Sequence, residues 1–380
     1  MDRARFKKNA PGETVKIGTG EHAFVPHKLP PTWMMSVDLW PLLAEAKQQL
    51  GILEGVGRTV PNPGILLRPV QDREAIKSSR LEGTYVTATE LLVFEMEPKK
   101  SASDDDRAND QREVLNYRRA LQHGVESDLP LSLRLIRELH KTLLTGVRGR
   151  DRTPGEFRRT QVAIGTDHRF IPPPPEQLWD CLDPFEKYLH SADRKHDPLV
   201  ACFLVHYQFE TIHPFNDGNG RVGRLFLVLM LKQWCELSKP WLYMSEYFEK
   251  NREEYIARLF KVSADGDWDR WIEFCLRGVV SQAKQTIERC ERIRTIREAF
   301  AKKVQEVGGN IRLSKIVDNI FQSPFLRIVD LAKRLGVTYP TANADVERLV
   351  QAGILQALSG ISPKTYYAPE VFGVAYEEMQ

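Results

Sequence analysis

Two apolar segments with helical spacing, joined by a turn rich in glycine, constrain the fold more than any other feature of the sequence. Asp197 and Pro198 make a typical helix start, because aspartate can cap free N–H groups and proline suits the first turn. We therefore expect a helix from this point to about Ile212, and a second one over Arg221–Cys235. A chain organised around such a pair is expected to be mainly α-helical.

Further helical patterns occur on both sides of this pair. They cover residues 39–50, 72–81, a segment capped by Thr87, 111–122, 131–144, 252–262 and 268–303. A chain of 380 residues is too long for one ordinary core. We divide it into a loose lead-in (1–30), an N-terminal helical region (31–125), a helical core (126–300) and a C-terminal domain (310–380).

Two stretches depart from the helical pattern. Residues 146–175 are dense in glycine and proline, and two extended pieces there flank a polar turn, which predicts a small β-hairpin. In the C-terminal domain, an amphipathic helix (Leu326–Leu335) is followed by a turn, a second helix (Pro340–Ala352) and two short strand-like pieces. Helix, turn, helix and hairpin form the pattern of a winged helix-turn-helix.

Composition narrows the function classes. Hydrophobic residues make up 42% and charged residues 28%, as in soluble globular proteins, and the formal charge of +3 does not suggest nucleic acid as the main partner. The longest apolar run, Leu225–Leu231, is far too short to cross a membrane. The N-terminus has no apolar segment of a secretory signal, and the five scattered cysteines suggest free thiols. We expect a cytoplasmic protein without a membrane partner.

The segment from His213 to Arg224 carries the chemistry. Its three glycines let backbone N–H groups converge at the start of the following helix, which makes a site for anions. Arg221 and Arg224 can bind phosphate oxygens, and Asp217 is a carboxylate suited to Mg²⁺. His213 can act as a general base near neutral pH. Together these groups predict phosphoryl transfer, and the absence of a Gly-Lys-Ser/Thr ending excludes a Walker A loop.

This segment resembles the signature of Fic-domain proteins, His-x-Phe-x-Asp/Glu-Gly-Asn-Gly-Arg-x-x-Arg, at every fixed position. ThrProGlyGluPheArg and GlnValAlaIleGly resemble the family's flap, the hairpin that docks the target segment. SerSerArgLeuGluGlyThr at 78–84 resembles its inhibitory motif. The resemblance covers about residues 25–375 and includes the C-terminal domain.

The resemblance implies a protein adenylyltransferase, which transfers AMP from ATP to a Ser, Thr or Tyr hydroxyl of a protein, itself included. His213 would be the base, Asp217 the Mg²⁺ ligand, and Glu82 an inhibitory group that pairs with Arg224. The residues implied in ATP binding are Gly218, Asn219, Gly220, Arg221, Val222, Gly223, Arg224 and Asn251, with Tyr247 near the base or sugar. Transfer of another nucleotide, removal of AMP, and self-association stay open.

A transcriptional regulator is the alternative outside enzymes. Its would-be recognition helix carries Asp345 and Glu347 against Arg348, and the predicted wing has Lys364. Because phosphate contacts supply most DNA affinity, this charge pattern argues for packing or partner recognition.

Other candidate residues are read by their place in the pattern. His206 is read as a packed core residue, and three further histidines as surface or packing residues: His140, His190 and His196. Glu156 and Arg158 stay open between target binding and bracing of the hairpin.

Overall fold

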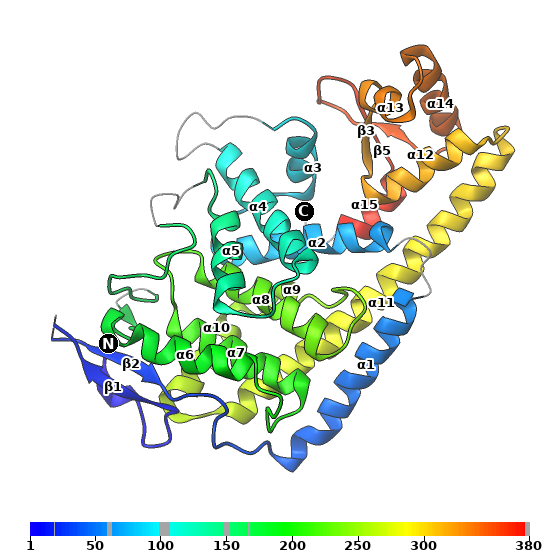
Figure 1. Cartoon of the computed structure of the whole chain (residues 1–380). Coiled ribbons are helices and arrows are strands. Elements are labelled where there is room, and N and C mark those ends of the chain that lie inside the picture. Colours follow the sequence, from blue (N-terminus) through cyan, green and yellow to red (C-terminus); the bar gives the residue numbers. More distant parts are fainter. Residues whose placement is uncertain (19, 59–62, 99–106, 148–152, 166–167, 377–380) are drawn as a thin grey trace.

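The two helices predicted around the glycine-rich turn pack against each other in the core of the molecule (Figure 1). They are α7 (Pro198–Ile212) and α8 (Asn219–Trp234). The computed structural model describes residues 1–18, 20–58, 63–98, 107–147, 153–165 and 168–376. Asp197 caps α7 as expected, since its carboxylate accepts a hydrogen bond from the Leu199 N–H at 2.9 Å. Nearly every residue of α7 is buried, so this helix forms the centre of the hydrophobic core.

Other helices cover this pair and confirm the mainly α-helical fold class. α4 and α5 pack on α8, and α6 packs on α7. A break at Asn251 separates two helices that lead into the long helix α11. The bounds are α4 (Arg107–Glu126), α5 (Leu133–Leu143), α6 (Leu178–Leu189), α9 (Ser245–Lys250), α10 (Arg252–Asp265) and α11 (Trp268–Glu306).

The N-terminal helices wrap around this core. α1 (Trp40–Arg58) runs along α11, and α2 (Gly64–Leu81) packs against α4 and α9 (Figure 1). α2 begins earlier than the predicted start at Asp72, because Pro63 and Gly64 initiate the helix instead of forming a loop. α3 (Ala88–Met96) starts with the predicted capping box, in which Thr87 and Glu90 exchange side-chain to backbone hydrogen bonds.

The expectation of a loose lead-in is wrong for residues 12–26. Two antiparallel strands, β1 (Gly12–Lys16) and β2 (His22–Pro26), form a hairpin there. Phe24 of β2 is fully buried, and its ring packs on the rings of Phe6 and Phe170. Because Phe170 belongs to the predicted flap, this contact joins the hairpin to the flap. This aromatic burial orders a segment whose Lys, Gly and Pro content suggested an unstructured one.

The predicted flap is held by one antiparallel bridge rather than by a ladder. Ile164 and Phe170 exchange backbone hydrogen bonds of 2.8 and 3.2 Å. The Phe24 N–H then donates to the Ile171 carbonyl at 2.8 Å, which links the flap to β2. Residues 148–152 and 166–167 of the predicted hairpin lie outside the described part of the chain.

The C-terminal domain has the helix, turn, helix and hairpin order that the sequence predicts. Its three strands form an antiparallel sheet in the order β3-β5-β4. The helix α12, the strand β3 and a last helix, α15, were not predicted. α15 reaches back to α2, where the Tyr376 hydroxyl donates to Asp72 Oδ2 at 2.8 Å. The bounds are α12 (Ile311–Gln322), β3 (Phe325–Arg327), α13 (Ile328–Leu335), α14 (Tyr339–Gln351), β4 (Gln356–Ala357), β5 (Thr365–Tyr367) and α15 (Pro369–Tyr376).

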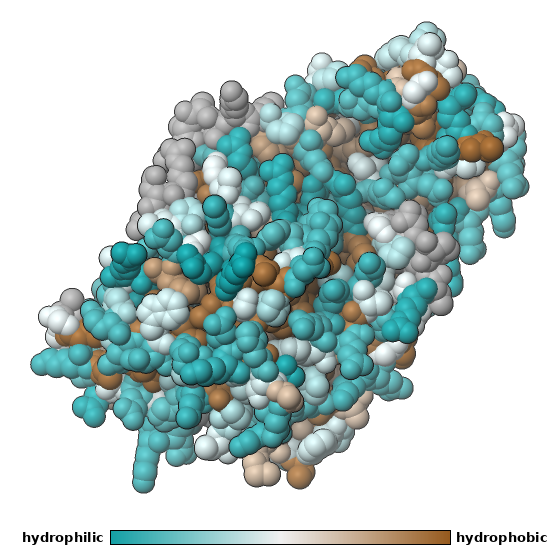
Figure 2. All heavy atoms as spheres, in the orientation of Figure 1, coloured by the Kyte–Doolittle hydropathy of each residue, from teal (hydrophilic) through white to brown (hydrophobic). Residues whose placement is uncertain are grey.

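Hydrophilic side chains cover most of the face shown in Figure 2, with hydrophobic ones scattered between them. Across the described residues, no helix combines the length and the apolar character that crossing a membrane requires.

Candidate functional site

The loop between α7 and α8 is closed by its own side chains and backbone. His213 ends α7 in the left-handed region (φ 50°), and Gly218 adopts φ 74° just before α8, where a side chain would be strained. The side-chain amide of Asn219 accepts from the Phe215 N–H and donates to the Phe215 carbonyl, both at 2.8 Å. Asn219 therefore braces the loop with its side chain, and only its backbone is left to face an anion.

His213 lies half-buried at the mouth of this loop. Its Nδ1–H donates to the Glu210 carbonyl at 3.3 Å, which leaves Nε2 as the basic nitrogen. Burial lowers the pKa of His213 to about 4, an effect that the charge of Arg158 reinforces and the hydrogen bond to Glu210 opposes. The imidazole is therefore neutral near pH 7, the form that can accept a proton.

Arg158 braces the loop from the flap side. Its guanidinium is buried and donates to the carbonyls of His213 at 2.8 Å, Pro173 at 2.5 Å and Thr160 at 3.2 Å. Its own N–H donates to the Pro214 carbonyl at 2.9 Å. Of the two roles left open for Arg158, these contacts favour bracing.

His140 of α5 holds the other side of the loop. Its ring is buried and stacks on Phe215 with the centroids 3.8 Å apart. Nδ1 accepts from the Gly155 N–H at 2.8 Å, so Nε2 carries the proton and donates to the Asp217 carbonyl at 3.0 Å. Burial lowers the pKa of His140 to about 4, which keeps it neutral. The sequence left His140 as either a surface or a packing residue, and these contacts favour packing.

The packed-core interpretation of His206 is confirmed. Its ring is fully buried, its Nε2 lies 2.8 Å from the Tyr255 hydroxyl, and it stacks near Phe248 and Trp271.

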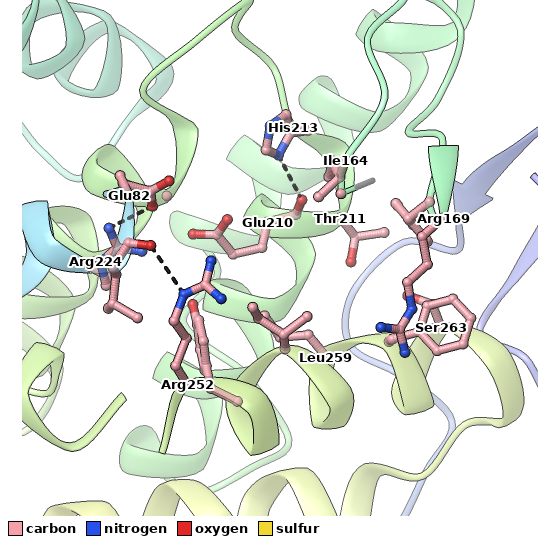
Figure 3. A pocket seen from close by; sticks show the side chains of 17 residues that line it. Glu82, Ile164, Arg169, Glu210, Thr211, His213, Arg224, Arg252, Leu259 and Ser263 are labelled. Carbon is pink, nitrogen blue, oxygen red and sulfur yellow. Dashed lines mark hydrogen bonds and ion pairs between the residues drawn. The ribbon is translucent and has the colours of Figure 1, made fainter. Parts of the chain in front are cut away.

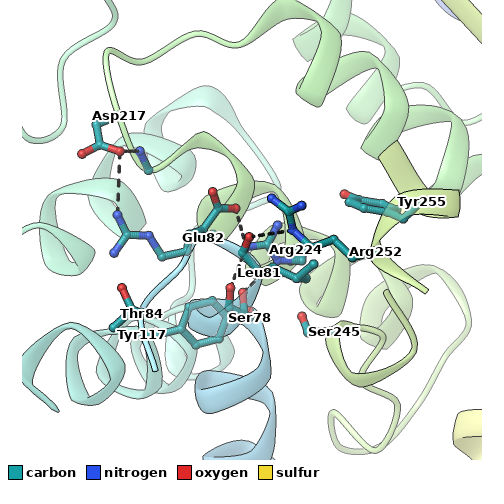
Figure 4. A network of polar contacts seen from close by, with 12 residues as sticks. Ser78, Leu81, Glu82, Thr84, Tyr117, Asp217, Arg224, Ser245, Arg252 and Tyr255 are labelled. Carbon is teal, nitrogen blue, oxygen red and sulfur yellow. Dashed lines mark hydrogen bonds and ion pairs between the residues drawn. The ribbon is translucent and has the colours of Figure 1, made fainter. Parts of the chain in front are cut away.

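Arg224 and Glu82 meet across the start of α8, as Figure 4 shows. Arg224 is buried, and its Nη2 donates to Glu82 Oε1 at 2.8 Å and to the Ser78 carbonyl at 2.9 Å. Its Nε donates to Ser78 Oγ at 2.9 Å. Burial raises the pKa of Glu82, but the charge and hydrogen bond of Arg224 outweigh this, so the pKa lies below its ordinary value. Glu82 is thus ionised near pH 7 and forms an ion pair with Arg224.

Two glycines of α8 allow acidic side chains to approach the helix. A Cβ on Gly220 would lie 2.2 Å from Glu82 Oε1, and one on Gly223 would lie 2.3 Å from Glu210 Oε1. Val222 between them is fully buried, so its side chain belongs to the core and only its backbone faces the loop. A side chain at either position would therefore displace a carboxylate from where it now lies.

Arg221 has a different acidic partner from Arg224. Its Nη1 donates to Glu113 Oε2 at 3.2 Å, and its Nη2 lies 3.8 Å from Asp217 Oδ1. Asp217 itself is half-exposed and accepts from the Gly218 N–H at 2.6 Å. The described residues contain no group of three or more His, Cys, Asp or Glu side chains arranged to hold a metal ion. A cation here would rely on Asp217 and on oxygens of a ligand.

A cavity of about 330 Å³ opens beside the loop (Figure 3). One end is polar and the other, between the flap and α10, is mostly apolar. Arg169 of the flap lies over the Phe260 ring at 5.2 Å. The polar end includes Glu82, Glu210, His213, Gly220, Arg224 and Arg252, and the apolar end includes Ile164, Phe170, Ile256, Leu259 and Phe260.

Tyr247 and Asn251 do not line this cavity. The Asn251 side chain donates to the Tyr247 carbonyl at 2.9 Å and so caps the end of α9. The neighbouring residues Arg252 and Tyr255 take the places facing the cavity. Sequence reasoning missed both, although their spacing on one helix face after Asn251 was readable.

Comparison with known proteins points to one family. Residues 40–126 match the description "Fic/DOC family N-terminal" and residues 130–231 match "Fic/DOC family". Proteins named protein adenylyltransferase Fic are similar over 181 residues, which are 46% of this chain: 30% identical in Drosophila grimshawi and 29% in Drosophila melanogaster. The matched regions are 35% and 34% of those proteins, so the chain spans about a third of the relatives' length.

Solved structures agree at the level of the fold. A Fic family protein from Desulfovibrio desulfuricans G20 has a TM-score of 0.57 and 20% identity, covering 89% of this chain and 98% of that one. Fic-1 (aa134–508) from C. elegans has a TM-score of 0.51 and 21% identity, covering 65% and 74%. These likenesses place the helical core and its loop in a known fold.

Proposed function

We propose that this chain, which belongs to the Fic/DOC family over residues 40–126 and 130–231, transfers AMP from ATP to hydroxyl groups of proteins, its own included. One observation carries the proposal. The neutral imidazole of His213 and the buried cation of Arg224 face one cavity at the N-terminus of α8, where backbone N–H groups favour phosphate. A base and a phosphate site at one cavity are the requirements for moving a phosphoryl group.

In the proposed reaction, His213 Nε2 takes the proton from a Ser, Thr or Tyr hydroxyl of the target. The freed oxygen bonds to the α-phosphorus of ATP, and the bond from that phosphorus to the pyrophosphate oxygen breaks. Pyrophosphate leaves with the electron pair. The backbone at the start of α8 would hold the phosphates, at Gly218, Asn219, Gly220, Arg221, Val222 and Gly223.

Arg221 and Arg224 have separate tasks in this scheme. Arg221 is fixed by Glu113, so it contributes a positive charge of set position near the loop. Arg224 would take the γ-phosphate, with which its guanidinium can form a paired hydrogen bond. The apolar end of the cavity, between the flap and α10, suits the base and sugar of the nucleotide. The neighbours of the nucleoside would then be the residues of this apolar end, and not Asn251 or Tyr247, which do not line the cavity.

Mg²⁺ is the cation that fits Asp217. A single half-exposed carboxylate is a poor site for a metal held by protein alone, but Mg²⁺ often binds through one carboxylate together with phosphates and water. When bound, the ion would neutralise charge on the phosphates. Asp217 would hold it at the edge of the loop, since its backbone carbonyl is fixed by His140.

Glu82 is the proposed inhibitory residue. Its carboxylate takes one Nη of Arg224 and lies against Gly220, the region where a terminal phosphate would have to sit. A carboxylate and a phosphate cannot share that place, because both carry negative charge and both need the same cation. Removal of AMP under the control of Glu82, and transfer of a different nucleotide, are the alternatives within enzymes. A cytoplasmic location and self-association remain part of the proposal and are not needed for the chemistry.

Labelled ATP tests the reaction directly. After incubation of the protein with a cell lysate and Mg²⁺, we expect label from the α-phosphate on protein bands, and none from the γ-phosphate. The assay should use Glu82→Gly as well as the natural chain, so that inhibition does not hide the activity. Transfer of the γ label would identify a kinase. If neither the natural chain nor Glu82→Gly transferred either label, the proposal would be contradicted.

A winged-helix regulator is the second candidate, and the element order of the C-terminal domain favours it. The charged residues of this domain do not favour a regulator. Arg348 of α14 is engaged, since it donates to the Val307 and Gly308 carbonyls. Asp345 was counted among the charges of the would-be recognition helix, but this residue is buried and paired with Arg312. Glu347 stays exposed on α14.

We therefore expect the full chain to bind random duplex DNA with a Kd weaker than ~10⁻⁶ M at physiological salt, as proteins with few phosphate contacts do. A gel-shift titration at two salt concentrations measures this. Nanomolar binding to one sequence would instead establish the regulator.

A further inference from the structure

Glu210, three residues before His213, is a partly buried acid for which the reaction scheme has no use. Its Oε1 is shielded from solvent and has no hydrogen-bond partner among the described residues. The side chain lines the cavity and points toward Arg224 and Glu82 (Figure 3). A buried carboxyl oxygen without a partner costs folding free energy unless the group becomes neutral or gains a partner, so its place at the polar end calls for an explanation.

Charged and titratable groups face Glu210 from every side of the cavity. Arg224 of α8 lies nearby, but its hydrogen bonds go to Ser78 and Glu82. Glu82 lies at the end of α2, and α10 contributes Arg252, whose Nε donates to the Leu81 carbonyl at 3.3 Å, and the Tyr255 hydroxyl. On α7 itself, His213 lies at the same cavity and His206 is buried behind it.

The balance of these groups keeps a large share of Glu210 protonated near pH 7. Burial raises its pKa to about 7, the charge of Arg224 opposes this, and the carboxylate of Glu82 adds to the rise. In a complex with ATP, the triphosphate would take the place of the Glu82 carboxylate and would again put negative charge beside Glu210. A protonated carboxyl has one O–H, so it can donate a hydrogen bond to a phosphate oxygen, whereas the ionised form would repel it.

We propose that Glu210 is a ligand of the terminal phosphate of ATP, which it binds as the neutral acid, beside Arg224 and in the space that the Glu82 carboxylate now occupies. The geometry of the cavity carries this assignment: Arg224 and Glu210 border the Glu82 carboxylate from two helices, and the approach of Glu210 depends on the missing side chain of Gly223. The inference rests on the proposed function, because it names a contact for its nucleotide.

Nucleotide binding measured from pH 6 to 9 tests the assignment without relying on transfer. The proteins compared are Glu82→Gly and Glu82→Gly/Glu210→Gln, and the ligands are ATP and AMP. We expect the Kd for ATP of Glu82→Gly to weaken at least tenfold from pH 6 to 9, because Glu210 loses its proton. The glutamine amide is a donor at every pH, so the double variant should lack this weakening. The protonation of ATP itself changes with pH in the same way for both proteins. The ratio of their Kd values therefore reports on Glu210 alone.

The ratio for AMP should stay constant with pH, because AMP has no terminal phosphate to contact Glu210. A third protein, Glu82→Gly/Glu210→Ala, should bind ATP more weakly at pH 6 than the glutamine variant, and thermal melting of all three checks that they are folded. Parallel pH curves for ATP in the glutamate and glutamine proteins would overturn the assignment while leaving the proposed function standing. Absence of ATP binding in every variant would overturn the proposed function itself, and this inference with it.

Discussion

Replacement of His213 by alanine should lower the rate of AMP transfer by ~10²–10⁴-fold, the usual loss when a positioned general base is removed. The imidazole is neutral at physiological pH because burial lowers its pKa to about 4, so it is ready to accept a proton without prior deprotonation. Its Nδ1–H is engaged with the Glu210 carbonyl, which fixes Nε2 as the reacting atom. The rate at which AMP-labelled protein forms in a timed assay measures the loss.

ATP binding should survive this substitution. The cations and backbone groups assigned to the phosphates remain, and the loop keeps its braces at Asn219, His140 and Arg158. A binding measurement on His213→Ala in the Glu82→Gly background separates the two effects. Transfer at the full rate would remove His213 from the mechanism, and a matching loss of ATP binding would mean that the loop had rearranged.

Sequence reasoning predicted the parts of the site that come from one continuous segment. Helices α7 and α8 follow from apolar spacing and from the Asp197–Pro198 start, and the capping box at Thr87 follows from local residue types. The meeting of Glu82 with Arg224 joins residues that are 142 positions apart, and no local rule contains such a distance. Resemblance to a family supplied that pairing, and the ion pair in the structure agrees with it.

The braces of the loop could not be predicted because their partners are backbone atoms. His140 binds the Asp217 carbonyl and the Gly155 N–H, and Arg158 binds four carbonyls, so neither leaves a pattern of paired side-chain types. The charge count on the would-be recognition helix did not reveal the place of Asp345 either. This acid lies on the inner side of α14 and is neutralised by Arg312 from α12, a contact that only the packed domain creates.

Replacement of Glu82 by glycine should raise AMP transfer, including self-modification, by about ten- to a hundredfold. In the natural chain Arg224 is committed to Glu82, and the carboxylate lies against Gly220. Once it is removed, Arg224 can bind the γ-phosphate through a charge-assisted hydrogen bond worth ~1.5–3 kcal/mol. Each 1.4 kcal/mol is a factor of ten in binding, which sets the expected gain.

The substitution should leave the fold intact, because Glu82 follows the last turn of α2 and Gly83 already takes the left-handed conformation there (φ 91°). Glu97→Gly is the matched control. Glu97 also ends a helix, α3, but it pairs with Arg327 outside the cavity, so its loss should not change transfer. Addition of His213→Ala to Glu82→Gly should abolish the gain, since the base is still needed.

An ordinary structural glutamate would behave in the opposite way. Loss of its ion pair would leave Arg224 buried without its anionic partner, which destabilises a protein and lowers activity. A gain therefore requires that something else, the γ-phosphate, takes the vacated place. If Glu82→Gly stays folded and its transfer rate is unchanged or lower, Glu82 is not inhibitory. A lower melting temperature would then assign its ion pair with Arg224 to holding α2 against α8.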